Sequence, residues 1–275
     1  MRTAVGKRCV PAVRSNILFC FTTSTFGNEN KMKAGLQLYN FRNALSTDYK
    51  GALREIAKIG FDGVEFAVNY GGMEPEEIAA FLKELKLECC GAMFKADDIV
   101  DPANKVYEYA KALNTPAVTF SIMKDFVANY EEIKNTIAAA GKAAGQNGFV
   151  FAYHNHWAEF AEMDGETVMD KILANTDPAN VFMEPDICWL TRGGQKPADF
   201  IRKYGNRIRQ IHFKDIMVPD DPSTTAVLGT GIVDIVSAAA AAKEINCQWL
   251  TYEQDNSSDP FQCAADSLKA LRKLI

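Results

Sequence analysis

The 275-residue sequence predicts an α/β fold, a single (β/α)8 (TIM) barrel. Short apolar runs alternate with segments whose apolar residues recur at helical spacing, and this alternation repeats eight times after residue 32. Such alternation favours a parallel sheet with right-handed crossovers. No glycine-rich G-x-G-x-x-G turn follows the first strand. A closed barrel is therefore favoured over an open dinucleotide-binding sheet.

Four strand–helix units are expected in the first half of the barrel. The first helix should end at Gly60, and the second opens with Pro75 in its first turn, where a missing N–H costs nothing. The strands are predicted at residues 34–39, 63–67, 88–95 and 117–122, and the helices at 48–60, 74–87, 102–113 and 125–145.

The second half repeats this pattern. Its strands are predicted at residues 149–156, 181–187, 207–213 and 248–253, and its helices at 166–175, 197–204, 232–245 and 260–275. One barrel domain is thus expected over residues 32–275. Residues 1–31, with four basic side chains and a short apolar patch, are expected to be a poorly ordered extension, with a weak targeting peptide as the alternative.

Composition excludes several classes of partner. Lys and Arg number 30 against 35 Asp and Glu, so a basic groove for nucleic acid is not expected. No apolar stretch approaches the roughly 20 residues of a membrane span. The seven cysteines form no C-x-x-C pair. Most of them are therefore expected to be reduced core residues of a cytoplasmic protein.

Ionisable residues collect where the predicted strands end, which is where barrel enzymes form their active sites. All three histidines of the chain are among them. The set comprises Glu65, His154, His156, Glu184, Asp186, His212, Lys214, Glu253 and Asp255.

Four of these residues form a predicted metal site. Charged groups facing into a barrel are costly unless they are paired or bound to a cation. The mixed nitrogen and oxygen donors suit one divalent cation such as Mn, Mg, Co or Zn. The predicted ligands are His154, Asp186, His212 and Glu253.

Other interpretations of individual residues remain open at this stage. Glu184 would lie deeper on the same strand face as Asp186 and could orient His154. Glu65 and Lys214 could instead form an ion pair that closes the barrel end. Hydrogen-bonded histidines at the rim are the alternative to a metal site for His154 and His156.

Three sequence runs resemble the sugar phosphate isomerase/epimerase superfamily, the xylose isomerase-like TIM barrel group. They are YHNHWAEF at 153–160, the run from EPDICWL to IHFKD at 184–215, and LGTGIVD followed by WLTYEQD. The group also contains inosose dehydratases, dehydroshikimate dehydratases and apurinic endonucleases. The resemblance covers roughly residues 33–275.

The resemblance implies one divalent cation held by four strand ends, with a glutamate, an aspartate, a histidine and a glutamate in chain order. Asp186, His212 and Glu253 match the last three, whereas His154 stands in place of the first glutamate. In the epimerases of the group, the two glutamates move a proton on and off carbon. An imidazole at position 154 therefore weakens epimerisation relative to elimination.

The expected function is a metal-dependent sugar isomerase or epimerase that acts by enolisation beside the carbonyl of a keto sugar. A lyase acting on a keto-cyclitol or keto-glycoside is the alternative, and a metal-free sugar-binding barrel is a weaker one. An apurinic endonuclease would need many more histidines and a basic groove. The resemblance also implies a small sugar or polyol substrate and a possible homo-oligomer.

Roles follow from this expectation for eight side chains. Glu253 is the predicted base, and His156 or Lys214 the predicted acid. Arg192 and Lys196 could hold a phosphate. The predicted substrate-binding residues are Glu65, Trp157 and Trp189, with the tryptophans as apolar walls or as simple packing.

Overall fold

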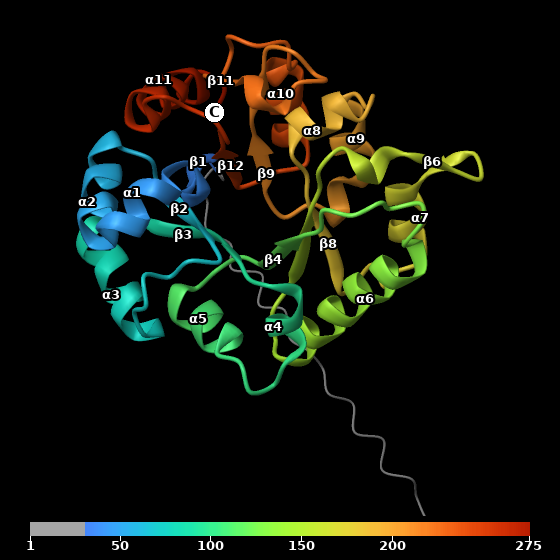
Figure 1. The fold of residues 1–275 in the computed structure, drawn as a ribbon, viewed down its shortest axis with the longest axis horizontal. Helices are drawn as coiled ribbons and strands as arrows, with labels where there is room; N and C mark the ends of the chain where they lie inside the picture. The colour runs from blue at the N-terminus through green and yellow to red at the C-terminus, as the bar shows by residue number, and fades with distance from the viewer. Residues whose placement is uncertain (1–30) are drawn as a thin grey trace, which may run out of the picture.

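Eight parallel strands form the predicted barrel in the computed structural model, which describes residues 31–275 (Figure 1). The expected extension at 1–31 lies outside the described residues, apart from Lys31. The strands run around the barrel in the order β8-β5-β4-β3-β2-β1-β12-β9. Their bounds are β1 Lys33–Gln37, β2 Gly63–Ala67, β3 Glu88–Met93, β4 Val118–Ser121, β5 Phe151–His154, β8 Val181–Glu184, β9 Ile211–Phe213 and β12 Trp249–Tyr252.

The barrel closes between β8 and β9 through two isolated parallel bridges. One joins Met183 to Ile208 and the other joins Asp186 to His212. The second bridge places two predicted metal ligands side by side at the seam. Closure of the barrel and assembly of the site therefore depend on the same pair of residues.

Helices follow the strands and cover the outside of the barrel (Figure 1). In α2, the side chain of Asp48 accepts a hydrogen bond from the Gly51 N–H at the first turn, and Gly60 ends the helix with a φ of 98°. The helix bounds are α1 Arg42–Thr47, α2 Tyr49–Ile59, α3 Pro75–Leu85, α4 Ala96–Val100, α5 Val106–Leu113, α6 Tyr130–Gln146, α7 Val168–Ala174, α8 Ile187–Arg192, α9 Pro197–Tyr204, α10 Ile235–Glu244 and α11 Pro260–Arg272.

Several predicted boundaries were wrong, among them the strand expected from 207, which begins at Ile211. The strand expected at 181–187 ends at Glu184, because Pro185 has no N–H for a ladder and Asp186 caps α8. The helix expected from 102 begins at Val106, and the one expected from 125 begins at Tyr130. Short helices α1, α4 and α8 were not predicted, since one or two turns carry little periodicity.

Two small hairpins also escaped prediction. β6 (Glu162–Met163) pairs with β7 (Glu166–Thr167), and β10 (Asp215–Ile216) pairs with β11 (Thr225–Ala226), both antiparallel. Strands of two residues are too short to show an alternating pattern. The loop between β10 and β11 brings Pro222 and Ser223 to the cavity at the mouth of the barrel.

Most buried apolar side chains of the described residues form one core that includes strands and helices, and Ala117, Ala152 and Phe182 form a small separate cluster. Four of the five described cysteines are buried and all five are free thiols, as expected for the core: Cys89, Cys90, Cys188 and Cys247 are buried, and Cys263 is half-buried.

Within residues 31–275, none of the helices combines the length and the apolar character that a membrane crossing requires.

Candidate metal centre and active site

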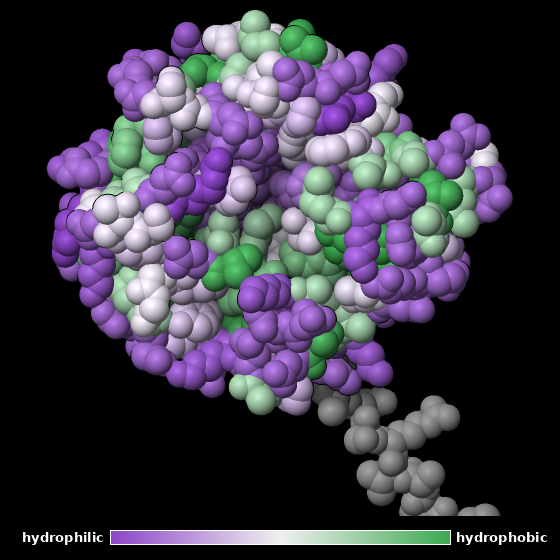
Figure 2. Space-filling model, viewed as in Figure 1, coloured by the Kyte–Doolittle hydropathy of each residue, from purple (hydrophilic) through white to green (hydrophobic). Residues whose placement is uncertain are grey.

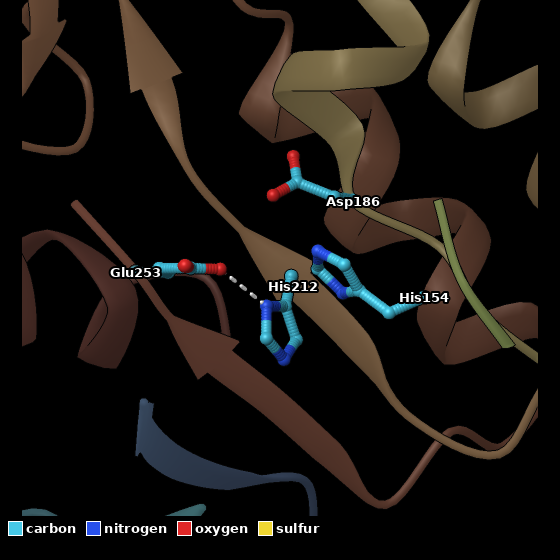
Figure 3. Close-up of side chains that lie close together, drawn as sticks. All are labelled: His154, Asp186, His212 and Glu253. Atoms are coloured by element: carbon cyan, nitrogen blue, oxygen red, sulfur yellow. Dashed lines mark hydrogen bonds and ion pairs between the residues drawn. The ribbon is translucent and has the colours of Figure 1, made fainter. Parts of the chain in front are cut away.

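The four predicted ligands converge at the carboxyl ends of the strands. One donor atom from each of His154, Asp186, His212 and Glu253 lies within 4.8 Å of the others, and all four residues are buried. Figure 3 shows the four side chains pointing toward a common centre. They come from the end of β5, from the residue that caps α8, from β9 and from the residue after β12. Parallel strands bring them together although they are far apart in sequence.

His212 is held at both ring nitrogens. Its Nδ1 atom lies 2.7 Å from Oε2 of Glu253, and its Nε2 atom lies 2.9 Å from Oε2 of Glu65. Oε1 of Glu184 is 3.1 Å from the same Nε2 atom. Burial alone would lower the pKa of His212, but Glu65 and Glu184 outweigh it and raise that pKa well above its usual value.

His154 is held by Glu184, the carboxylate predicted to orient it. The Nδ1 atom of His154 lies 3.1 Å from Oε1 of Glu184. Burial, reinforced by the neighbouring His212, lowers the pKa of His154 well below its usual value. The ring is therefore neutral, with Nδ1–H donating to Glu184 and Nε2 directed toward the other three side chains (Figure 3). A neutral imidazole held in this way is the form that binds metal ions.

The two carboxylate oxygens of Asp186 have different roles: one caps α8 and the other faces the predicted metal site. Oδ1 accepts hydrogen bonds from the backbone N–H groups of Cys188 and Trp189 at 2.8 and 3.1 Å. Oδ2 is buried and has no hydrogen-bond partner, although Nζ of Lys214 lies 3.4 Å away. A buried oxygen left without a hydrogen bond is costly unless something else satisfies it. The donor set and this free oxygen fit a divalent cation.

Lys214 is a buried cation among three carboxylates. Its Nζ atom lies 3.1 Å from Asp255 and 3.3 Å from Glu253, in addition to Asp186, and its side chain is only 1% exposed. Burial alone would lower its pKa, but Glu253 and Asp255 raise it well above the usual value. Lys214 forms no ion pair with Glu65, so that alternative was wrong. Nζ also lies 4.6 Å from the ring centre of Trp189.

Glu65 lies deeper than predicted. It was grouped with the residues at the strand ends and expected to bind substrate, but two further residues of β2 follow it within the predicted bounds, and Glu65 is fully buried. It is not among the residues that line the cavity. Its Oε2 atom contacts His212 and accepts a hydrogen bond of 3.1 Å from Gln210 Nε2. Glu65 therefore supports His212 from within the barrel.

The sequence did not predict two polar residues that support the site. Gln210 donates through Nε2 to both Glu65 and Glu184, and Oδ1 of Asn155 accepts a 3.1 Å hydrogen bond from the Asp186 N–H. Spacing could have indicated Gln210, because residues 210, 212 and 214 alternate onto one face of an extended strand.

A cavity of about 790 Å³ opens at this end of the barrel. Among the residues that line it are His154, His156, Trp157, Trp189 and Glu253. Figure 2 shows the face of the molecule hollowed near its centre, with hydrophilic atoms along the upper border and hydrophobic atoms along the lower one. The volume is in the range of pockets that hold small organic ligands.

His156 and the two tryptophans form one wall of the cavity. The rings of Trp157 and Trp189 lie 5.2 Å apart, and His156 is 6.0 Å from Trp189. Nδ1 of His156 is buried without a hydrogen-bond partner, and burial lowers the pKa of His156 to about 4. Neutral imidazole and indole surfaces make this wall suitable for one face of a sugar ring.

Arg192 and Lys196, considered as phosphate ligands, lie elsewhere. Neither is among the residues that line the cavity. The guanidinium carbon of Arg192 instead lies 3.6 Å from the ring centre of Trp157 and supports that wall from behind.

The chain belongs to the xylose isomerase-like TIM barrel family, whose model matches residues 53–274, and it is an enzyme of that family. Among curated proteins, it is 25% identical to inosose dehydratase from Lactiplantibacillus plantarum over 68% of this chain and 71% of that protein. The family resemblance in the sequence is confirmed.

Solved structures share the fold. A sugar phosphate isomerase/epimerase from Parabacteroides distasonis superimposes with a TM-score of 0.73 at 19% identity, covering 91% of this chain and 97% of that one. A probable 3-DHS dehydratase from Bacillus anthracis gives a TM-score of 0.70 at 15% identity, covering 88% and 99%. At these identities the likeness concerns the fold.

Proposed function

We propose that this protein is a divalent-metal-dependent enzyme that enolises a ketone-bearing sugar or cyclitol and completes the reaction as a lyase. The convergence of His154, Asp186, His212 and Glu253 at the bottom of a sugar-sized cavity carries the proposal. The similarity to inosose dehydratases supports elimination as the outcome.

A cation bound by these four residues would withdraw charge from the substrate carbonyl and stabilise negative charge on its oxygen. Other side chains of the protein would orient the metal ligands and shield the substrate from water. Glu184 and Glu65 hold the two ligand imidazoles in orientation. Trp157 and Trp189 exclude water from one side of the substrate and present apolar surface to it.

Glu253 is the proposed base that removes the proton next to the carbonyl. Lys214 and His212 flank it: burial alone would raise the pKa of Glu253, but the Lys214 cation and the hydrogen bond with His212 lower that pKa well below the usual value, so Glu253 is ionised. His156, a neutral imidazole, is the proposed hydrogen-bond donor to the departing oxygen, since it lines the cavity and its Nδ1 atom has no protein partner. The departing oxygen takes up the proton that Glu253 has removed from carbon. Lys214 holds Glu253 and Asp255 in place.

The position of His154 favours elimination over epimerisation. Epimerisation by proton exchange needs a base on each face of the substrate carbon. His154 is committed through Nδ1 to Glu184, which leaves Nε2 for a metal ion and none of its nitrogens for proton transfer. Glu253 is then the only carboxylate of the four-residue group that lines the cavity.

Isomerisation or epimerisation is the second candidate. It has the support of the shared fold with a sugar phosphate isomerase/epimerase. The proton held by Glu253 would then return to carbon, and no oxygen would leave the substrate. Enolisation is common to both candidates, so that their difference lies in the fate of the intermediate.

Metal content and product analysis test the proposal. We expect about one equivalent of divalent metal in the wild type, loss of that metal in His212→Ala, and retention in Glu88→Ala, a control at an exposed carboxylate. With an inosose in D₂O, the metal-loaded enzyme should incorporate deuterium beside the carbonyl and release a product with the ultraviolet absorbance of a conjugated enone. A protein that binds no metal after soaking with Mn or Co would refute the mechanism, and exchange without an enone would favour isomerisation.

A further inference from the structure

Gln37, the last residue of β1, is a buried polar side chain in the wall of the cavity. Its exposed fraction is only 1%, yet it lines the cavity together with His156 and Glu253. A carboxamide has two N–H donors and one acceptor oxygen, and each of these groups is costly when it is buried without a partner. The partners of the amide therefore indicate what Gln37 can do.

The backbone holds the amide oxygen of Gln37. Oε1 accepts a 3.2 Å hydrogen bond from the Tyr39 N–H, at the point where β1 is followed by the 3-10 helix η1 (Leu38–Phe41). A backbone N–H can only donate, so the oxygen has to occupy this side of the amide. The orientation of the amide is thereby fixed, and its other side carries the two N–H donors.

The amide nitrogen of Gln37 lacks an oxygen acceptor. Nε2 lies 3.6 Å from Sδ of Met93, a residue that also lines the cavity. A thioether is a weak acceptor, and it can take only one of the two N–H groups. No oxygen atom of the described residues accepts a hydrogen bond from Nε2. A substrate oxygen at this position would satisfy a donor that the protein leaves almost unpaired.

Strand pairing places Gln37 beside the proposed base. β1 lies between β2 and β12 and is parallel to both. Leu36 pairs with Tyr252, so the next residues along the two strands, Gln37 and Glu253, are neighbours in the cavity wall. Gln37 also pairs with Glu65 on β2, whose side chain lies inside the barrel, and paired residues of neighbouring strands point to the same face.

A neutral donor next to Glu253 suits one particular substrate oxygen. Glu253 would remove the proton from the carbon next to the ketone, so a donor on the neighbouring strand lies close to that carbon. In a keto sugar or a cyclitol ketone, the same carbon carries a hydroxyl group. Its oxygen can accept a hydrogen bond from Nε2, while the carbonyl oxygen lies against the cation. The amide does not titrate and adds no charge beside Glu253.

We infer that Gln37 is a substrate-binding residue that determines specificity, and that its Nε2 atom donates a hydrogen bond to the hydroxyl group on the carbon that Glu253 deprotonates. The inference rests on the proposed function. It goes further because it assigns a substrate contact to a residue outside the metal-ligand group, and because it selects ketones with a hydroxyl group next to the carbonyl. Gln37 keeps its own protons throughout the reaction.

The test compares an inosose, which has a hydroxyl group on both carbons next to the ketone, with a cyclohexanone that has hydroxyl groups only at carbons 3, 4 and 5. The measured quantity is the ratio of kcat/KM for enone formation, inosose over trihydroxycyclohexanone, with metal-loaded protein. Gln37→Met removes the donor at similar size. It should lower the ratio by about three- to tenfold, the effect of one hydrogen bond between neutral groups, and change kcat/KM for the trihydroxy compound by less than about twofold. Gln248→Met, the same substitution at an exposed glutamine before β12, should leave the ratio as in the wild type.

Failure of the inference and failure of the proposed function are distinguishable. If Gln37→Met leaves the ratio unchanged, or lowers kcat/KM equally for both compounds as a structural role would, the inference is overturned while the lyase function stands. If neither compound is converted, the lyase function fails, and calorimetric titration of the metal-loaded protein with both compounds tests the contact. An affinity ratio that falls in Gln37→Met by about three- to tenfold supports the contact, and an unchanged ratio overturns it. Absence of binding by both compounds would overturn the inference and the proposed function together.

Discussion

The Nε2 atom of His212 lies 2.9 Å from Oε2 of the fully buried Glu65, while its Nδ1 atom faces the predicted ligand group. A carboxylate that accepts a hydrogen bond from the far nitrogen of a ligand histidine fixes the tautomer and the ring orientation, and it raises the basicity of the other nitrogen. Glu65 therefore contributes to metal affinity without touching the substrate cavity.

Glu65→Gln should weaken metal binding by about 10- to 100-fold, because the amide supports the imidazole less well than the carboxylate does. Calorimetric titration of the metal-free protein with Mn measures the effect. Glu88→Gln is the matched control, since Glu88 is an exposed carboxylate at the start of β3. An unchanged affinity in Glu65→Gln would show that His212 does not depend on this contact.

The sequence predicted the convergence of the site because it follows from the fold. Once the strands alternate with helices, the carboxyl ends of strands that carry His154, Asp186, His212 and Glu253 have to meet at one mouth. The packing inside the barrel was harder to predict. Glu65 contacts His212 and not Lys214, and this choice depends on how side chains from different strands pack inside the barrel, which the strand bounds alone do not determine.

Local chemistry explains the remaining errors. Asp186 was assigned to the site alone, although one of its oxygens also starts α8, which truncates the predicted strand. Gln210 was overlooked because an uncharged amide gives no signal of its own in a sequence. Its contacts with two buried glutamates are visible only when three strands are placed together.

Lys214→Met should destabilise the metal-free protein by about 3–5 kcal/mol, because Asp186, Glu253 and Asp255 would lose their buried counterion. A bound divalent cation would offset part of that loss. Thermal unfolding with chelator and with Mn should therefore show a larger metal-induced rise in Tm for Lys214→Met than for the wild type. Lys269→Met, at an exposed lysine, is the control. An equal rise in both proteins would contradict the role of Lys214 as the counterion.

Asp215→Ala should loosen the loop that contains Gly229, Thr230 and Gly231. The Oδ2 atom of Asp215 accepts hydrogen bonds of 2.9 Å from the N–H groups of Gly229 and Gly231, and Oδ1 accepts one of 3.1 Å from Val233. Hydrogen bonds to a charged group each contribute about 1.5–3 kcal/mol. Hydrogen exchange at residues 229–233 should become at least about tenfold faster. Asp221→Ala, at an exposed cap, should leave these amides protected, and unchanged exchange in Asp215→Ala would refute the prediction.

Glu159 should make the stability of the protein fall as pH rises. Burial raises the pKa of Glu159 to about 7, although the His156 N–H and the Tyr153 hydroxyl both donate to its Oε1 atom. Its usual value is 4.5. The folded protein thus keeps a proton that the unfolded chain loses, so this contribution is complete below pH 4.5 and is lost as pH rises through about 7.

The matching variant is Glu159→Gln, which resembles the protonated carboxyl and does not titrate. Between pH 4.5 and 8, the free energy of unfolding of the wild type should fall by about 3 kcal/mol relative to that of Glu159→Gln. Urea unfolding across this range measures the difference, in which the titration of all other groups cancels. For Glu162→Gln, at an exposed position in β6, the free energy of unfolding should change with pH as it does in the wild type. Parallel curves for the wild type and Glu159→Gln would instead mean that Glu159 titrates in the folded protein as it does in the unfolded chain.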